Sequence, residues 1–237
     1  MQINHSRYCF LLIFSLLVSF AVIPQAVLAQ VTNAQQNKMD DFIKDVKFND
    51  VKAVKKALDA GMSPNTSDKF GNTVLSIAIV EKSTDSAKLL INSPSIDLER
   101  PNLAGETPLM MAAFHGSLEL VKYLINQRSV EINHPGWSAM HYASTNGHFA
   151  IVEFLLDKGA YVDPESPNGT TALMMAARGG HITIVRLLLD RGADLSVHNR
   201  LNLTAIDFAE DNNQEEIGKG LRSRWLKLFN NPYPPKR

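Results

Sequence analysis

A short motif that occurs four times at nearly constant spacing is the feature that most limits how this chain can fold. Its copies begin at Gly71, Gly105, Gly136 and Gly169, which lie 34, 31 and 33 residues apart. A period near 33 is typical of stacked helical units, each of which buries its apolar face only against its neighbours. The spacing therefore predicts an all-α solenoid, and the usual task of such an array is to hold another molecule.

Two of these units also continue alike after the motif. Segments 147–160 and 180–193 both read Gly-His-x-x-Ile-Val-x-x-Leu-Leu-Asp-x-Gly-Ala. They closely resemble the ankyrin-repeat family, and the stretch from Thr107 to Ala113 is similar to the Thr-Pro-Leu-x-x-Ala-Ala opening of that family's repeat. The resemblance implies about six stacked helix pairs, counting a polar cap at each end, with β-turns or hairpin loops that project from the stack.

The glycines that open the units set the expected domain boundaries. In the unit from Gly136, we expect the inner helix at 139–145 and the outer helix at 149–158, where apolar residues recur at three-and-four spacing. The expected segments are a signal peptide at 1–29, a linker at 30–38, an N-terminal capping repeat at 39–70, repeats at 71–104, 105–135, 136–168 and 169–201, a C-terminal capping repeat at 202–229 and a flexible tail at 230–237.

Two joints between units depart from the repeat pattern. Glycine closes several outer helices, as Gly159 does, because a left-handed residue commonly ends a helix there. At the aligned positions stand Pro94, whose ring forbids positive φ, and Arg128. We therefore expect altered outer-helix ends at these joints, and a shortened loop near Pro135.

The first thirty residues have the pattern of a secretory signal peptide. Arg7 precedes an apolar run from Tyr8 to Val22, and small or short side chains follow up to Ala29. We expect cleavage after Ala29 and a periplasmic protein of a Gram-negative bacterium; secretion and an uncleaved N-terminal anchor stay open. The only cysteine, Cys9, lies in the apolar run, so the exported part depends on packing alone for its stability.

Charge and motifs exclude several classes of function. The 24 basic and 24 acidic side chains balance, which does not favour a nucleic-acid partner. No phosphate-binding glycine loop, nucleophile elbow or paired carboxylate is visible in the sequence. His148 and His181 occupy equivalent repeat positions, so we expect them to close the turn between helices, and the histidines lack the spacing of a zinc motif. We expect no catalytic residue, no metal, no cofactor and no small-molecule substrate.

Partner contacts are expected where ankyrin-repeat proteins usually make them, at the loop tips and along the exposed side of the inner helices. Transferred to this sequence, the resemblance selects Phe70, Asn72, Leu103, Glu106, Trp137, Asn168 and Thr170 at the tips, and Phe114, His115, Thr145, Asn146 and Arg178 on the inner helices. Trp137 is the strongest candidate, because aromatic residues often dominate the energy of an interface. Alternatively, Trp137 folds down over the shortened loop, and the same two readings apply to Phe114.

The C-terminal segment also has two interpretations. The run from Trp225 to Phe229 combines apolar side chains with basic neighbours, which suits contact with a membrane or a partner. We favour the alternative, in which these apolar residues cover the last helix pair. The proline-rich residues beyond 229 predict an extended or disordered end.

Together these observations predict an exported protein that binds another protein of the cell envelope through its concave face. Three roles stay open. The chain inhibits an envelope enzyme in the manner of an immunity protein, which is the role we favour; or it is a scaffold or stabiliser of a periplasmic enzyme, such as one of oxidative defence; or it is a secreted effector that binds a host protein.

Overall fold

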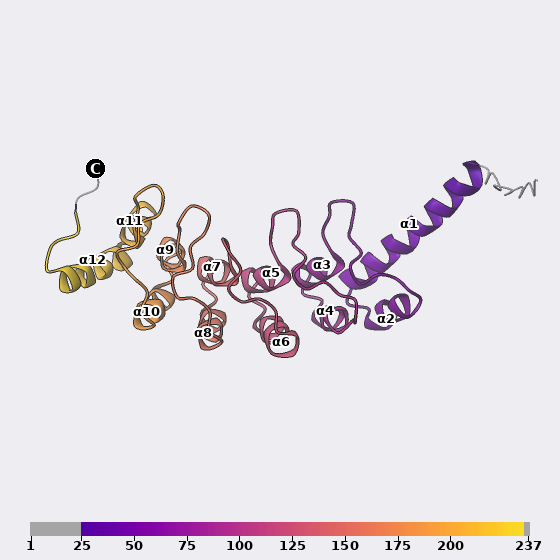
Figure 1. Ribbon diagram of the computed structural model, residues 1–237, viewed down its shortest axis with the longest axis horizontal. Helices are drawn as coiled ribbons and strands as arrows, with labels where there is room; N and C mark the ends of the chain where they lie inside the picture. Colours follow the sequence, from indigo (N-terminus) through magenta and orange to yellow (C-terminus); the bar gives the residue numbers. More distant parts are fainter. Residues whose placement is uncertain (1–24, 235–237) are drawn as a thin grey trace, which may run out of the picture. The chain divides into compact units, whose positions relative to one another are not determined.

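The computed structural model describes residues 25–234, which form twelve α-helices (Figure 1). Ser67 and Thr73 make an isolated antiparallel bridge in the loop before the third helix. The chain divides into two compact units, residues 1–37 and 38–237, and the repeats all lie in the second. The core of the expected signal peptide lies outside the described residues. Among the described helices, none has the length and hydropathy needed to cross a membrane.

Each helix pair consists of an inner helix followed by an outer helix, which confirms the predicted all-α array of about six pairs. The inner helices are α1 (Gln25–Lys47), α3 (Val74–Val80), α5 (Pro108–Phe114), α7 (Ala139–Thr145), α9 (Ala172–Arg178) and α11 (Ala205–Asp211). The outer helices are α2 (Val51–Asp59), α4 (Thr84–Ile91), α6 (Leu118–Arg128), α8 (Phe149–Asp157), α10 (Ile182–Asp190) and α12 (Glu215–Phe229). Helices α3 to α11 pack in one row and α4 to α10 in a second row (Figure 1).

Threonine or serine fixes the start of every inner helix from α3 onward. The hydroxyls of Thr73, Thr107 and Thr171 accept a hydrogen bond from the backbone N–H three residues further on. Such a cap satisfies one of the N–H groups that the first helical turn leaves without a partner. Because these three caps sit at the same place in their units, the loops before α3, α5 and α9 enter their helices in the same way.

Small apolar residues pack between the inner helices, and larger apolar residues line the outer helices. Alanines such as Ala112 and Ala176 are fully buried and allow the inner helices to approach closely. The predicted outer-helix stripe of α8 is confirmed, with Ile151, Val152 and Leu155 buried. The buried apolar residues form one continuous cluster along the second unit.

The two irregular joints end their outer helices differently, as predicted. After α6, Ser129 adopts a left-handed conformation with φ 51°, in the role that glycine has elsewhere. After α4, no residue from Asn92 to Pro94 has a positive φ, whereas Gly61, Gly159 and Gly192 have one after their helices. The Arg128 guanidinium donates to the carbonyl of Ile91, so the next unit satisfies the end of α4.

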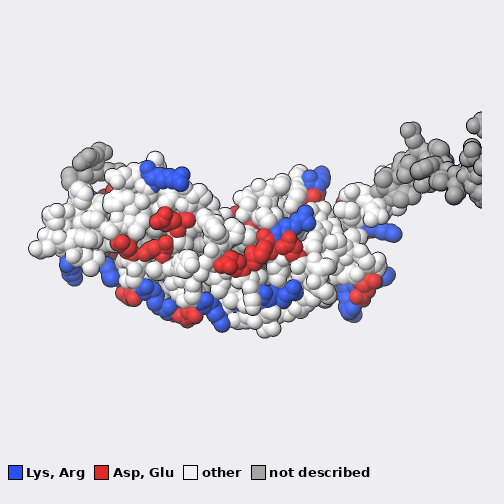
Figure 2. Space-filling view, in the orientation of Figure 1, with Lys and Arg blue, Asp and Glu red and all other residues white. Residues whose placement is uncertain are grey.

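Successive loop tips contact one another, except at one place. A β-carbon on Gly71 would lie 2.9 Å from the Leu103 side chain, and one on Gly169 would lie 3.3 Å from the Asn199 backbone. At Gly105, no neighbouring loop comes within 4 Å of that position. The loop before α7 is low, whereas the loops on either side stand high (Figure 1), and the outline dips between them (Figure 2). The shortened loop therefore opens a gap in the row of tips.

His148 and His181 connect neighbouring units, which agrees with their expected place at the turn between helices. The Nε2 of His148 lies 2.9 Å from the carbonyl oxygen of Phe114, and that of His181 lies 2.9 Å from that of Thr145. Each carbonyl belongs to the last residue of the inner helix one unit earlier: Phe114 ends α5, and Thr145 ends α7. A β-carbon on Gly116 would lie 2.6 Å from the His148 ring, so this approach requires glycine.

His141 is buried in α7 and caps this helix together with Ser138. Its Nδ1 lies 3.2 Å from the backbone nitrogen of Ser138, and its Nε2 lies 3.0 Å from the carbonyl oxygen of Thr170. This arrangement suits a neutral ring that accepts at Nδ1 and donates at Nε2. Burial lowers the pKa of His141 below its usual 6.5, although hydrogen bonds to backbone carbonyls act in the opposite direction.

His141 should make the protein less stable in mild acid. Because its folded-state pKa is below the unfolded value of 6.5, the unfolded chain takes up the proton first as the pH falls. This contribution to stability is complete above pH 6.5 and is lost as the pH falls toward the folded-state pKa. In His141→Gln, glutamine retains the capping geometry without titrating, so its thermal midpoint should fall less between pH 7 and 5 than that of the wild type. The exposed control His198→Gln should follow the wild type; equal pH dependence of His141→Gln and the wild type would contradict the assignment.

The end of the chain returns to cover α11. Tyr233 is half-buried, its ring centroid lies 4.9 Å from that of Trp225, and its hydroxyl donates to the buried carboxylate of Asp207. Burial and this hydrogen bond raise the pKa of Tyr233 to about 12. Trp225 therefore packs against the core as the capping interpretation predicts, whereas Leu226, Leu228 and Phe229 remain 49%, 58% and 45% exposed. The contacts of Tyr233 differ from the expected flexible tail, because residues 230–234 include this fixed side chain.

Tyr233→Phe should lower the free energy of unfolding by about 1 kcal/mol, because Asp207 loses one hydrogen-bond donor while the ring stays packed. This corresponds to a thermal midpoint lower by roughly 2–4 °C for a chain of this size. Differential scanning calorimetry provides the measurement. Tyr161→Phe, on an exposed tyrosine, is the matched control and should leave the midpoint unchanged; equal midpoints for both variants would contradict the capping role.

Candidate protein-binding surface

Two rows of side chains face outward from the inner helices and define what we call the inner surface. The fourth and seventh residues of a helix lie on one face, because three residues make nearly one turn. The fourth-position row contains Ile77, Met111, Tyr142, Met175 and Phe208, and the seventh-position row contains Val80, Phe114, Thr145, Arg178 and Asp211.

The inner surface changes from apolar to charged along the solenoid. The fourth-position row is apolar or aromatic throughout, and its members are buried or half-buried. In the seventh-position row, Val80 and Phe114 are 43% and 40% exposed, whereas the later exposed positions are Arg178 and Asp211. Exposed apolar side chains are thus concentrated in the N-terminal half of this surface, where a partner has most to bury.

A small hollow of about 270 Å³ lies at this apolar end. Ile77, Val80 and Met111 supply its apolar lining, and Asp68 and Glu81 are its acidic residues. The hollow has room for one apolar side chain of a partner, because a single large side chain occupies less than this volume.

Trp137 lies on the inner helices and does not stand free at a loop tip. Its ring centroid is 5.2 Å from that of His141 and 6.4 Å from that of Tyr142. The Phe114 ring meets Tyr142 edge-on at 5.9 Å. Trp137 nevertheless remains 37% exposed, so it combines the two predicted arrangements: it folds down at the shortened loop and still offers a surface to a partner.

Glu106 stands beside this aromatic group. Its carboxylate accepts a hydrogen bond from the side-chain amide of Asn102 at 2.8 Å. Burial, the charge of Glu106 and a hydrogen bond to that carboxylate raise the pKa of Tyr142 to about 12. The tyrosine hydroxyl is a neutral donor beside the Glu106 carboxylate.

Most other predicted contact residues are accessible, but several have structural roles. Phe70 and Leu103 are exposed at the loop tips, His115 is half-buried beside Phe114, and Arg178 is exposed on α9. Four polar members make hydrogen bonds within their loop or to a nearby backbone carbonyl: Asn72, Thr145, Asn146 and Asn168. A partner that binds here competes with these bonds.

Thr170 corrects one expectation. It is only 2% exposed, and its backbone N–H donates to the Ser166 hydroxyl at 2.9 Å. Its carbonyl oxygen receives the hydrogen bond of His141. The sequence predicts Thr170 at an exposed loop tip. In the structure its side chain points into the stack of helices, so it does not reach a partner.

Two accessible residues of the inner surface, Val80 and Tyr142, are absent from the predicted contact residues. The available signal was the repeat itself, because aligning the inner helices places these residues at the fourth and seventh positions. Tip residues were selected instead, since the resemblance points there first.

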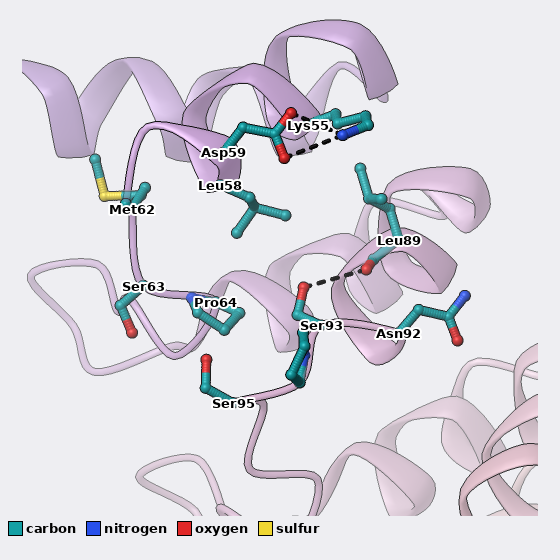
Figure 3. Close-up of a pocket in the computed structure, with 12 residues that line it drawn as sticks. Lys55, Leu58, Asp59, Met62, Ser63, Pro64, Leu89, Asn92, Ser93 and Ser95 are labelled. Carbon is teal, nitrogen blue, oxygen red and sulfur yellow. Dashed lines mark hydrogen bonds and ion pairs between the residues drawn. The ribbon is translucent and has the colours of Figure 1, made fainter.

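A larger hollow, of about 580 Å³, lies at the joint between α2 and α4, away from this surface (Figure 3). Lys55 and Asp59 face each other across its edge in an exposed ion pair, and Ser93 donates to the carbonyl of Leu89. These polar side chains thus already have partners within the protein, and the hollow coincides with the helix end that Pro94 alters. We attribute it to this irregular joint.

Acidic side chains gather in two groups on the face shown in Figure 2, between the loops and the outer helices. Some acids that precede the loops connect neighbouring units. The carboxylate of Glu99 accepts from the N–H of Glu131 at 2.9 Å, and that of Asp163 accepts from the N–H of Asp194 at 2.8 Å. Within residues 25–234, no group of three His, Cys, Asp or Glu side chains has the arrangement needed to hold a metal ion.

Capped helix pairs, glycine-closed turns and an accessible inner surface define a solenoid repeat protein, and sequence comparison identifies the family. A family model described as ankyrin repeats (3 copies) matches residues 42–135 and 95–166. A second, described as ankyrin repeats (many copies), matches residues 161–209. These matches span more than half of the chain, which belongs to the ankyrin-repeat family.

The curated relatives include the human protein named ankyrin repeat domain-containing protein 39. It is 52% identical to this chain over 31 residues, which are 13% of this chain and 17% of that protein. The chain thus covers only a small part of this relative, about the length of one repeat. Ankyrin repeats form protein-binding modules that are typically not enzymes, and this is the class of function that the family assigns to the chain.

Proposed function

We propose that this chain is an exported protein that binds a protein partner of the cell envelope on its inner surface and inhibits it. The observation that carries the proposal is the group of exposed apolar side chains at Val80, Phe114 and Trp137 beside a small hollow. Interface cores are enriched in aromatic residues, and Phe114 and Trp137 are exposed on this half of the surface. The signal-peptide pattern supports export. A stable solenoid that covers part of an enzyme blocks access to it without any chemistry of its own.

The test begins with affinity capture from cell-envelope extract, using the protein with a C-terminal tag so that export is undisturbed. Three baits are compared: the wild type, Phe114→Ala with Trp137→Ala, and Phe149→Ala. Phe149 is 38% exposed on outer helix α8, which makes it a matched control for Phe114 and Trp137. A partner retained by the wild type and Phe149→Ala, and lost by the double variant, supports binding at the inner surface. Equal retention by all three baits contradicts it.

The activity of the captured enzyme then distinguishes the roles. Loss of activity on addition of the purified protein supports inhibition. Unchanged or prolonged activity supports a stabilising scaffold, whose binding adds stability to its partner by mass action. Recovery of the protein mainly outside the cell supports a secreted effector.

A further inference from the structure

Three aromatic rings gather on α5, on α7 and on the loop before α7, and one carboxylate lies beside the middle ring, Tyr142. Phe114, Trp137 and Tyr142 form the aromatic cluster, in which Phe114 and Trp137 each contact Tyr142, with interplanar angles of 79° and 56°. Phe114 and Trp137 keep more than a third of their surface accessible. Glu106 lies beside Tyr142 and precedes the cap of α5.

The negative charge of Glu106 has no cationic partner in this part of the molecule. Its neighbours Asn102 and Tyr142 are neutral hydrogen-bond donors. None of the ion pairs found among residues 25–234 includes Glu106.

The aromatic cluster likewise lacks a cation of its own. Over the described part of the chain, lysine and arginine side chains lie above four other aromatic rings: Phe70, Tyr123, Phe154 and Tyr233. Neither Phe114, Trp137 nor Tyr142 is covered in this way. Among the described residues, therefore, no lysine or arginine is found over the aromatic cluster, and none pairs with Glu106 beside it.

We propose that the aromatic cluster and Glu106 bind a lysine or arginine side chain of the protein partner. Aromatic faces attract cations within about 6 Å of the ring centroid, and a carboxylate adds a charge-assisted hydrogen bond. A purely apolar partner would bury the charge of Glu106 with only two neutral hydrogen-bond donors beside it and no opposite charge, which is costly. The inference rests on the proposed function and adds the chemistry of the partner residue.

The shortened loop explains why the site lies here. At the neighbouring tips, the next loop covers the glycine, as Leu103 does at Gly71. No loop covers Gly105, the residue before Glu106. A long, flexible side chain such as lysine or arginine can therefore enter from the loop side, along the gap, and reach the carboxylate and the rings.

The test uses the purified protein and a displayed library of random 12-residue peptides. We expect enriched peptides to contain lysine or arginine beside an apolar residue. A synthetic representative is then titrated by calorimetry against the wild type, Phe114→Leu, Glu106→Gln and the control Phe149→Ala. Leucine keeps the apolar bulk of Phe114 without its aromatic face, and glutamine keeps the shape of Glu106 without its charge.

The two site variants should bind the peptide about fivefold more weakly or worse, since each removes one attraction to the cation. Phe149→Ala should bind like the wild type, and replacing the basic residue of the peptide by glutamine should cause a similar loss. Enrichment of peptides without basic residues, no enrichment at all, or equal affinity for wild type and both site variants would overturn the inference. If the envelope partner is still lost by the Phe114→Ala, Trp137→Ala bait in that case, binding at the inner surface stands and only the cation preference falls.

Discussion

Leu155→Ala is expected to lower the free energy of unfolding by about 2–5 kcal/mol. Leu155 is completely buried in α8, which packs between α6 and α10. Alanine leaves a cavity that well-packed neighbours fill only in part. The loss of stability therefore includes the transfer free energy of the removed methyl groups and the cost of the remaining cavity. Because repeat proteins are held together by contacts between neighbouring units, a defect in the central unit weakens the coupling on both sides.

Urea unfolding followed by circular dichroism measures this loss. Leu226→Ala is the control, since Leu226 is 49% exposed on α12 and should change stability by less than about 0.5 kcal/mol. Leu188→Ala should behave like Leu155→Ala, because Leu188 has the equivalent buried position in α10. A loss below about 1 kcal/mol for both buried leucines would show that the stack relaxes around the cavity more than its close packing implies.

Trp137→Ala is expected to weaken binding of the envelope partner by about 2 kcal/mol or more, which is roughly thirtyfold in dissociation constant. The indole is 37% exposed at the apolar end of the inner surface, where a partner would bury it completely. The free energy of unfolding should fall by less, about 0.5–1.5 kcal/mol, because Trp137 is partly exposed and its aromatic contacts with His141 and Tyr142 are each of modest strength.

Binding is measured by calorimetry with the partner identified by capture, and stability by the thermal midpoint of the same preparations. Phe149→Ala provides the control for an aromatic residue of similar exposure on an outer helix. A midpoint as low as that of Leu155→Ala, together with unchanged affinity, would show that Trp137 serves only to cover the shortened loop.

The sequence alone determined the architecture of this protein. The near-constant spacing of Gly71, Gly105, Gly136 and Gly169 identified the repeat, and the three-and-four pattern identified the outer helices. Even the irregular joints at Pro94 and Arg128 were predicted. These features are local, because turn chemistry and helix periodicity depend on residues a few positions apart, and a repeat states the same local pattern several times.

The arrangement of residues on the candidate binding surface was decided by the tertiary structure. Thr170 turns inward, Trp137 lies down on Tyr142, and Glu106 faces the same tyrosine from the preceding unit. Tyr233 returns to Asp207 across more than twenty residues of chain. The contact between Glu106 and Tyr142 joins two units, and the geometry of all these contacts depends on how far each loop reaches and how each helix is rotated in the stack. A one-dimensional pattern carries no such distances, so the solenoid was predictable whereas the arrangement of its aromatic and acidic residues became visible only in three dimensions.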